Sequence, residues 1–139
     1  MGRICLEGTL TCPRPLLPPD PGLREFDFGA WDGLRFDAVA EGCPDLSRAY
    51  WEEPGDHAPP SGESWNAAAA RVNAAVDRLM AAHPGPLTLV AHLGVILTQV
   101  QRGAGSTAKE ALSHRIDPLS VTEVRYGPAP AVARINHHP

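Results

Sequence analysis

The sequence predicts a single α/β domain, in which a buried strand leads into a helix and a longer helix packs beside them. Residues 87–91 are a short apolar run, partly β-branched, and a helical pattern follows them as far as Gly103. Residues 63–82 carry a second and longer helical pattern. Residues 120–126 and 131–135 alternate, although imperfectly, as two paired strands do. Alternation of strand and helix patterns indicates an α/β architecture.

His92 lies at the corner where the first predicted strand becomes a helix. Free backbone N–H groups and the positive end of the helix dipole favour an anion at such a corner. The carboxyl end of a strand is also the usual ligand side of an open α/β sheet. An imidazolium at this position could therefore hold a phosphoryl oxygen. The alternative is a histidine that only hydrogen-bonds to a neighbouring loop.

Composition indicates one globular domain and excludes several classes of protein. The chain has 139 residues, is 43% hydrophobic and carries a formal net charge of −4 with acids and bases intermixed, which argues against nucleic-acid binding. Apolar runs fall short of the roughly 20 residues that span a bilayer, and the first residues lack the apolar core of a signal peptide. Three cysteines form neither a metal pair nor an even disulfide set, which favours a reducing cytoplasm: Cys5, Cys12 and Cys43.

The N-terminal quarter divides into a connector and an acidic, aromatic loop. Residues 1–22 contain at most a short strand over Ile4 to Thr11, since five prolines follow between Cys12 and Gly22, so we expect an irregular connector. Residues 23–33, LREFDFGAWDG, interleave large apolar groups with carboxylates. A carboxyl group beside bulky aromatic rings suits a general acid, because desolvation favours its protonated form. The alternative is an acidic loop that its aromatic rings merely anchor.

Helices are predicted over most of the middle of the chain. Residues 34–50 favour one or two short helices interrupted at Gly42 and Pro44, and His57 lies in a loop that we expect to be exposed to solvent. The helix at residues 63–82 is the clearest element, because its apolar residues follow the i, i+3, i+4, i+7 pattern of one buried face. Those residues are Trp65, Ala68, Ala69, Val72, Ala75, Val76, Leu79 and Met80.

The ends of the later elements are also predicted from local residues. We expect Ser61 or Gly62 as the N-cap of the long helix, and His83-Pro84-Gly85 as its end. Thr107 is expected to cap a short helix through Leu112 or Ser113. His137 and His138 are expected to be disordered beside the terminal proline and are not interpreted as metal ligands.

Several of these stretches together, in their order and spacing, resemble the histidine phosphatase superfamily, which has the phosphoglycerate-mutase-like fold. The stretches are LREFDFGAWDG, then PPSGESW opening a long helix that contains Arg71-Val72, then LTLVAHLGVI, then SVTEVRY. The first of them looks most like the small phosphatases of the α-ribazole phosphatase type. The resemblance covers residues 23–135 and implies a three-layer arrangement, a sheet flanked by helices.

The resemblance also implies a site and a class of substrate. In that family a histidine of an Arg-His-Gly motif attacks phosphorus, and a carboxylate of the Leu-x-Glu loop protonates the leaving oxygen. By resemblance, Glu25 is the general acid and His92 is the second histidine, which stabilises charge on the transferring phosphoryl group. Leu93 and Gly94, directly after that histidine, are the implied substrate-binding positions. The implied substrate is a small phosphorylated metabolite, with no cofactor and no metal required.

The chain departs from the family pattern at the nucleophile. No Arg-His-Gly occurs in the sequence, and neither Arg3 nor Arg14 matches the family's second arginine motif. Leu93 and Leu97 replace residue types that are common at those positions, a small residue and an arginine. We therefore expect an N-terminally incomplete domain with negligible phosphohistidine turnover by this chain alone. Either the chain is a truncated form of a full phosphatase, or a partner, such as a second copy in a homodimer, completes its sheet.

Two other functions remain open from the sequence. One is a non-catalytic module that binds a phosphate ester or another partner and keeps His92 with the helix dipole. The other is an unrelated hydrolase in which Cys5 or Cys43 is the nucleophile beside His92. Neither cysteine has a cationic neighbour in sequence that would favour a thiolate, which argues against the second of these.

Overall fold

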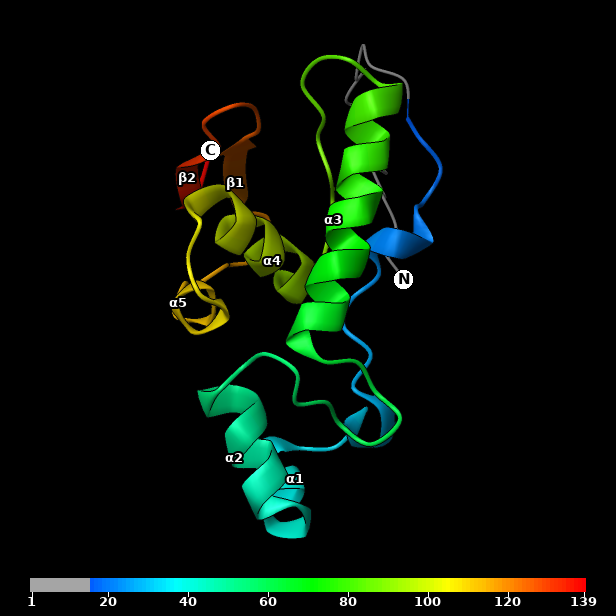
Figure 1. Cartoon of the computed structure of the whole chain (residues 1–139), viewed down its shortest axis with the longest axis vertical. Coiled ribbons are helices and arrows are strands. Elements are labelled where there is room, and N and C mark those ends of the chain that lie inside the picture. The colour runs from blue at the N-terminus through cyan, green and yellow to red at the C-terminus, as the bar shows by residue number, and fades with distance from the viewer. Residues whose placement is uncertain (1–15) are drawn as a thin grey trace.

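The computed structural model describes residues 16–139, which form five α-helices, two short 3-10 helices and one two-stranded antiparallel sheet (Figure 1). The possible strand at Ile4 to Thr11 lies outside the described residues. The elements in chain order are η1 (Pro21–Leu23), η2 (Gly29–Trp31), α1 (Phe36–Gly42), α2 (Pro44–Glu52), α3 (Trp65–Ala82), α4 (Leu93–Ala104), α5 (Ala108–Leu112), β1 (Val121–Arg125) and β2 (Ala131–His137).

The core lies where α3 packs against α4, and the predicted apolar face of α3 is the face that packs there. Five of its eight predicted residues are buried and the other three are partly buried; the buried ones are Trp65, Ala68, Val72, Ala75 and Val76. From α4, Val95, Leu97 and Val100 are buried in the same core. Alanine at two of the buried α3 positions, Ala68 and Ala75, lets the helix backbones approach closely. The helical pattern at residues 63–82 is thus confirmed.

The N-cap of α3 differs from the predicted one. Ser64 holds that position, and its hydroxyl oxygen accepts a hydrogen bond from the Ala67 N–H at 3.2 Å. Ser61 and Gly62 lie instead in a preceding turn, where the Gly62 N–H donates to the Pro59 carbonyl. Serine is a good cap at either position, so the sequence alone places the boundary only within a few residues.

Helices α1 and α2 form a small unit at one end of the molecule, reached from α3 through the loop at residues 53–64 (Figure 1). The predicted interruption near Gly42 and Pro44 is confirmed, because α1 ends at Gly42 and Pro44 begins α2. Val39 and Tyr50 form its apolar core together with Trp31 of η2, and Ser47 of α2 is buried as well. His57, in the connecting loop, is exposed as expected.

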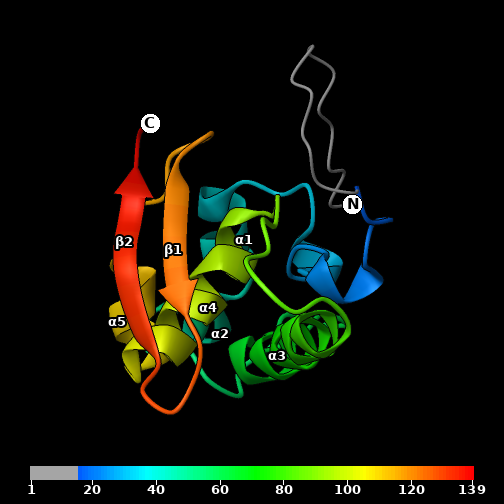
Figure 2. The same ribbon diagram turned by 90° about the horizontal axis from the view of Figure 1, so that it is seen from above.

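The C-terminal strands β1 and β2 form the predicted hairpin, which packs on α4 opposite α3 (Figure 2). At Gly103 of α4 an added Cβ would lie 2.6 Å from Val124 of β1, so a glycine permits the close approach of helix and hairpin. The expectation of disorder at the C-terminal histidines was wrong. His137 is the last residue of β2, and the His138 ring lies 3.2 Å from the Asp117 carboxylate.

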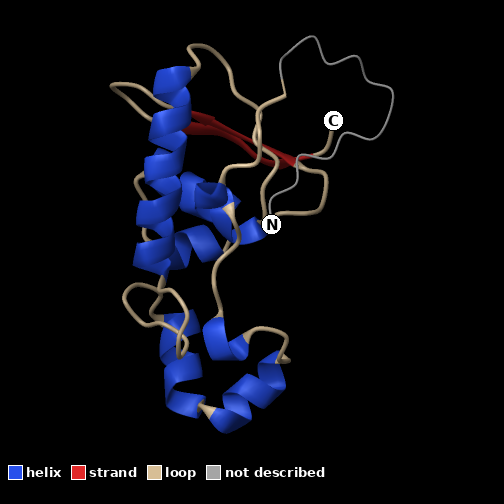
Figure 3. Ribbon diagram, turned by 90° about the vertical axis from the view of Figure 1, so that its right-hand side faces the viewer, coloured by secondary structure: helices blue, strands red, loops and turns tan. Residues whose placement is uncertain are grey.

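The prediction of a buried strand at residues 87–91 was wrong for the described part of the chain. The segment forms no strand, and Leu89 and Val90 are 37% and 49% exposed. A strand is buried only if neighbouring strands pair with it, and within residues 16–139 no backbone hydrogen bond joins this segment to another. The three-layer sheet is likewise reduced to one hairpin in the described part, drawn in red in Figure 3.

The described helices include none that combines the length and the apolar character needed to cross a membrane.

Candidate functional site

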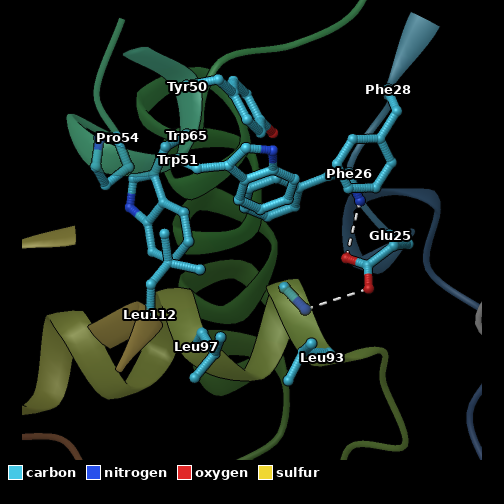
Figure 4. A pocket seen from close by; sticks show the side chains of 11 residues that line it. Glu25, Phe26, Phe28, Tyr50, Trp51, Pro54, Trp65, Leu93, Leu97 and Leu112 are labelled. Carbon is cyan, nitrogen blue, oxygen red and sulfur yellow. Dashed lines mark hydrogen bonds between the residues drawn. The ribbon is translucent and has the colours of Figure 1, made fainter. Parts of the chain in front are cut away.

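The loop that carries Glu25 is fastened to the first turn of α4, as Figure 4 shows. The Gly94 N–H donates a hydrogen bond to Glu25 Oε2 at 3.2 Å, and the Phe26 N–H donates to Oε1 at 2.9 Å. Gly94 is the second residue of α4, so the carboxylate accepts from one of the N–H groups that lack a partner within the helix. It also lies at the positive end of the helix dipole.

His92 is the N-cap residue of the same helix, two positions before Gly94. Its backbone is extended, with φ −80° and ψ 167°, its side chain makes no capping hydrogen bond, and the residue is exposed. The structure therefore brings Glu25 to the turn that His92 begins. No hydrogen bond or ion pair joins their side chains within the described residues, so the catalytic roles expected for both stay predictions.

Leu93 and Gly94, the two implied substrate-binding positions, lie at the mouth of a pocket with Glu25 (Figure 4). An added Cβ at Gly94 would lie 2.5 Å from Glu25 Oε1 and 2.9 Å from the Phe26 ring. Glycine at this position is thus what lets the acidic loop approach the helix so closely. His92 is not among the residues that line the pocket.

A largely buried ion pair that the sequence did not predict holds the Glu25 loop in place. The Arg71 guanidinium donates to the carbonyls of Gly22 at 2.9 Å and Arg24 at 3.0 Å, and pairs with both oxygens of Glu63. Glu63 Oε1 also accepts from the Asp27 N–H at 3.0 Å. The side chains of Arg71 and Glu63 are 17% and 13% exposed, so the pair is largely removed from water.

The signal for this pair was present in the sequence. Arg71, beside Val72, follows a run of four alanines at the edge of the buried face of the helix. A charge so placed needs a partner. Nothing in the sequence, however, indicates that the partners are carbonyls from residues 22 and 24 together with Glu63.

The pocket beside Glu25 is mostly apolar. Its volume is about 90 Å³, and its walls come from the Glu25 loop, α2, α3, α4 and α5. Tyr50, Trp51, Trp65 and Phe26 supply aromatic surface. Burial, together with the negative charges of Glu63 and Glu25, raises the pKa of Tyr50 to about 12.

Other groups in the described residues suggest no second chemistry. No cluster of three or more His, Cys, Asp or Glu side chains within residues 16–139 is arranged to hold a metal ion. Cys43 is a partly buried free thiol between α1 and α2, packed against the cluster of Trp31, Val39 and Tyr50. Cys5 lies outside the described residues.

The chain matches known proteins over nearly all of the described part. A family model for the histidine phosphatase superfamily (branch 1) matches residues 16–137. The bifunctional protein Rv2228c of Mycobacterium tuberculosis and the uncharacterized protein Mb2253c of Mycobacterium bovis are each 35% identical over 120 residues, which are 84% of this chain and 33% of theirs. The chain thus spans about one third of the length of these curated relatives.

Solved structures with a similar fold include a mycobacterial phosphatase. YhfR of Bacillus stearothermophilus superposes with a TM-score of 0.76 at 25% identity, covering 86% of this chain and 61% of that one. The mycobacterial glucosyl-3-phosphoglycerate phosphatase Rv2419c, in complex with inorganic phosphate, gives 0.69 at 26% identity, covering 84% and 63%. With a family model matched over residues 16–137 and these folds alongside it, the chain belongs to branch 1 of the histidine phosphatase superfamily.

Proposed function

We propose that the first turn of α4 and the Glu25 loop form the phosphoryl-binding corner of a phosphomonoesterase-type domain. One observation supports this most directly: the Glu25 carboxylate reaches across 69 positions of sequence to the Gly94 N–H. The acid expected from the family motif and the helix that His92 begins thereby meet at one place. The helix N-terminus supplies N–H groups and a favourable dipole for an anion there.

In this proposal His92 and the N–H groups of α4 hold the phosphoryl oxygens, and Glu25 delivers a proton to the leaving oxygen. Both carboxylate oxygens of Glu25 now accept from backbone N–H groups. Proton delivery therefore requires the side chain to turn away from Gly94, which frees that N–H for a phosphoryl oxygen. The phosphoryl oxygen and the Glu25 carboxylate would thus accept from the Gly94 N–H in turn.

We propose further that this 139-residue chain alone forms no phosphohistidine, because it contains no Arg-His-Gly. Where the nucleophile and its partners act as a unit, removal of the nucleophile costs on the order of 10⁶-fold in rate. The test is rapid-quench hydrolysis of p-nitrophenyl phosphate, with trapping of labelled phosphate on the protein. No burst and no label are expected; a labelled histidine would refute the proposal.

Binding tests the corner independently of turnover. Calorimetric titration with inorganic phosphate is expected to show one site that His92→Ala abolishes. Glu25→Gln is expected to bind phosphate at least as tightly as the native chain, because the substitution removes a like charge from the corner. Phosphate binding without turnover would also fit the second candidate, a non-catalytic phosphate-ester-binding module, which the absence of Arg-His-Gly favours. Absence of phosphate binding would count against both.

A further inference from the structure

The pocket beside Glu25 has walls of one chemical character. Trp51 from α2 and Trp65 from α3 face it, and Leu97 of α4 and Leu112 of α5 close it (Figure 4). Phe26 stacks edge-on against Trp65, with ring centroids 5.4 Å apart. Nearly the whole lining is therefore aromatic or aliphatic.

We infer that this pocket binds a compact apolar group, such as a single aromatic ring, of a phosphate or phosphonate ester whose anionic end lies at the α4 N-terminus. The inference rests on the proposed function, because that function places the anion. Leu93 and Gly94 line the pocket and begin α4, so the anion position and the pocket are continuous. One ligand can occupy both.

The size of the pocket limits the apolar group. A cavity of about 150 Å³ with apolar walls holds a benzene molecule. The volume here is about 90 Å³, and two of its lining residues, Trp51 and Leu93, are themselves exposed. The pocket therefore encloses most of one ring and leaves the ring's edge at the surface. A fused or branched apolar group would extend into solvent.

The polar groups of the lining select against sugars. The Trp65 indole N–H already donates to Gln101 Oε1 at 2.7 Å, and both Glu25 oxygens accept from the backbone, so the Tyr50 hydroxyl and the Trp51 indole N–H are the other polar side-chain groups of the lining. A ligand rich in hydroxyl groups would have to give up water for a wall that offers few hydrogen-bond partners, which is unfavourable. An apolar ring gives up no hydrogen bonds to water there, and its burial against aromatic surface is favourable.

Two phosphonates test this inference without depending on turnover. Phenylphosphonate and methylphosphonate carry the same anionic group on a non-hydrolysable carbon, and differ in the apolar group. Calorimetry with the 139-residue chain is expected to give phenylphosphonate about tenfold tighter binding, since roughly half of a ring's burial free energy corresponds to that factor. Equal affinity for the two would overturn the pocket assignment and leave the phosphoryl corner intact.

Variants separate the two ends of the site. Trp51→Ala removes one wall and is expected to abolish the preference for phenylphosphonate while methylphosphonate binding stays unchanged. Phe36→Ala is the matched control, because Phe36 is an exposed aromatic ring that touches Trp51 but does not line the pocket; it should keep the preference. Retention of the preference in Trp51→Ala would refute the inference.

The same titrations distinguish failure of the inference from failure of the proposed function. If His92→Ala binds phenylphosphonate as tightly as the native chain, the ring pocket stands and the phosphoryl corner is wrong. If neither phosphonate binds the native chain, the assignments of the ring pocket and of the phosphoryl corner are both wrong.

Discussion

Gly94 has no room for a side chain, and its position ties the acidic loop to α4. Because it has no Cβ, Glu25 and the Phe26 ring can lie directly against the helix backbone. Gly94→Ala is expected to push the Glu25 loop outward and to lower the free energy of unfolding by about 1–3 kcal/mol, as overpacking does. Urea unfolding measures the change.

Gly42 provides the control for that substitution. It ends α1 and has no atom within 4 Å of where a Cβ would lie. Gly42→Ala is expected to leave stability unchanged or to raise it by about 0.5–1 kcal/mol, since alanine favours the helix. Equal losses in both variants would mean that contact with Glu25 and Phe26 is not the cause at Gly94.

The raised pKa of Tyr50 predicts that the free energy of unfolding falls at high pH. Its pKa is about 12 in the folded chain, against 10.0 for the free side chain. Below pH 10 both states keep the proton, so the stability is unaffected; above pH 10 the unfolded chain loses its proton first. The free energy of unfolding should therefore fall as the pH rises from 10 toward 12. Tyr50→Phe should make this fall shallower in denaturant titrations at successive pH values, and an unchanged slope would contradict the shift.

At the scale of elements, Arg71 connects α3 to the loop that presents Glu25. Arg71→Met keeps the aliphatic stem and removes every hydrogen bond of the guanidinium, which leaves the Glu63 carboxylate with the Asp27 N–H and the Arg24 guanidinium, 3.8 Å away, as its partners. Breaking a fully buried pair by removing one partner typically costs about 3–5 kcal/mol, and the partners that Glu63 keeps place the expected loss below that range. The loss of stability should appear in urea unfolding, and the Glu25 loop should become more sensitive to proteolysis.

Arg48→Met is the matched control for that change. Arg48 pairs with Asp45 across one turn of α2, where the two side chains are 65% and 91% exposed. Exposed pairs of this kind contribute about 0–1 kcal/mol, so stability should hardly change. A loss at Arg71 no larger than that at Arg48 would show that the buried pair does not stabilise the loop.

Elements whose pattern is local were predictable from the sequence, and contacts between distant segments were not. The α3 face, the break between α1 and α2 and the Thr107 cap follow from spacing and from single residues. Burial of residues 87–91 depends on a neighbouring strand, which the run itself does not specify. At the site, the resemblance pointed to Glu25 and His92. The carbonyls that Arg71 binds lie nearly fifty positions away, and no local pattern predicts such a pairing.

At the scale of the whole molecule, residues 87–91 form a segment without regular structure that exposes apolar side chains. Leu89 and Val90 face solvent, and this segment takes part in no backbone hydrogen bond within the described part of the chain. Unpaired edges of this kind tend to pair with another strand. We propose that a second copy of the chain, one of the two alternatives drawn from the sequence, supplies the strand.

Pairing with a second copy predicts that amide hydrogen exchange at residues 88–91 depends on the protein concentration. In dilute protein the amides of residues 88–91 should exchange with deuterium quickly, while those inside α3 are protected by helical hydrogen bonds. If a second copy pairs with this edge, protection at 88–91 should rise with protein concentration, in step with a doubling of mass by light scattering. Val90→Lys should abolish both effects, because a charge on an edge strand opposes pairing. The matched control, Val121→Lys, alters an equally exposed valine in a strand that is already paired with β2. A monomeric mass at every concentration, with rapid exchange at 88–91 throughout, would rule out the homodimer.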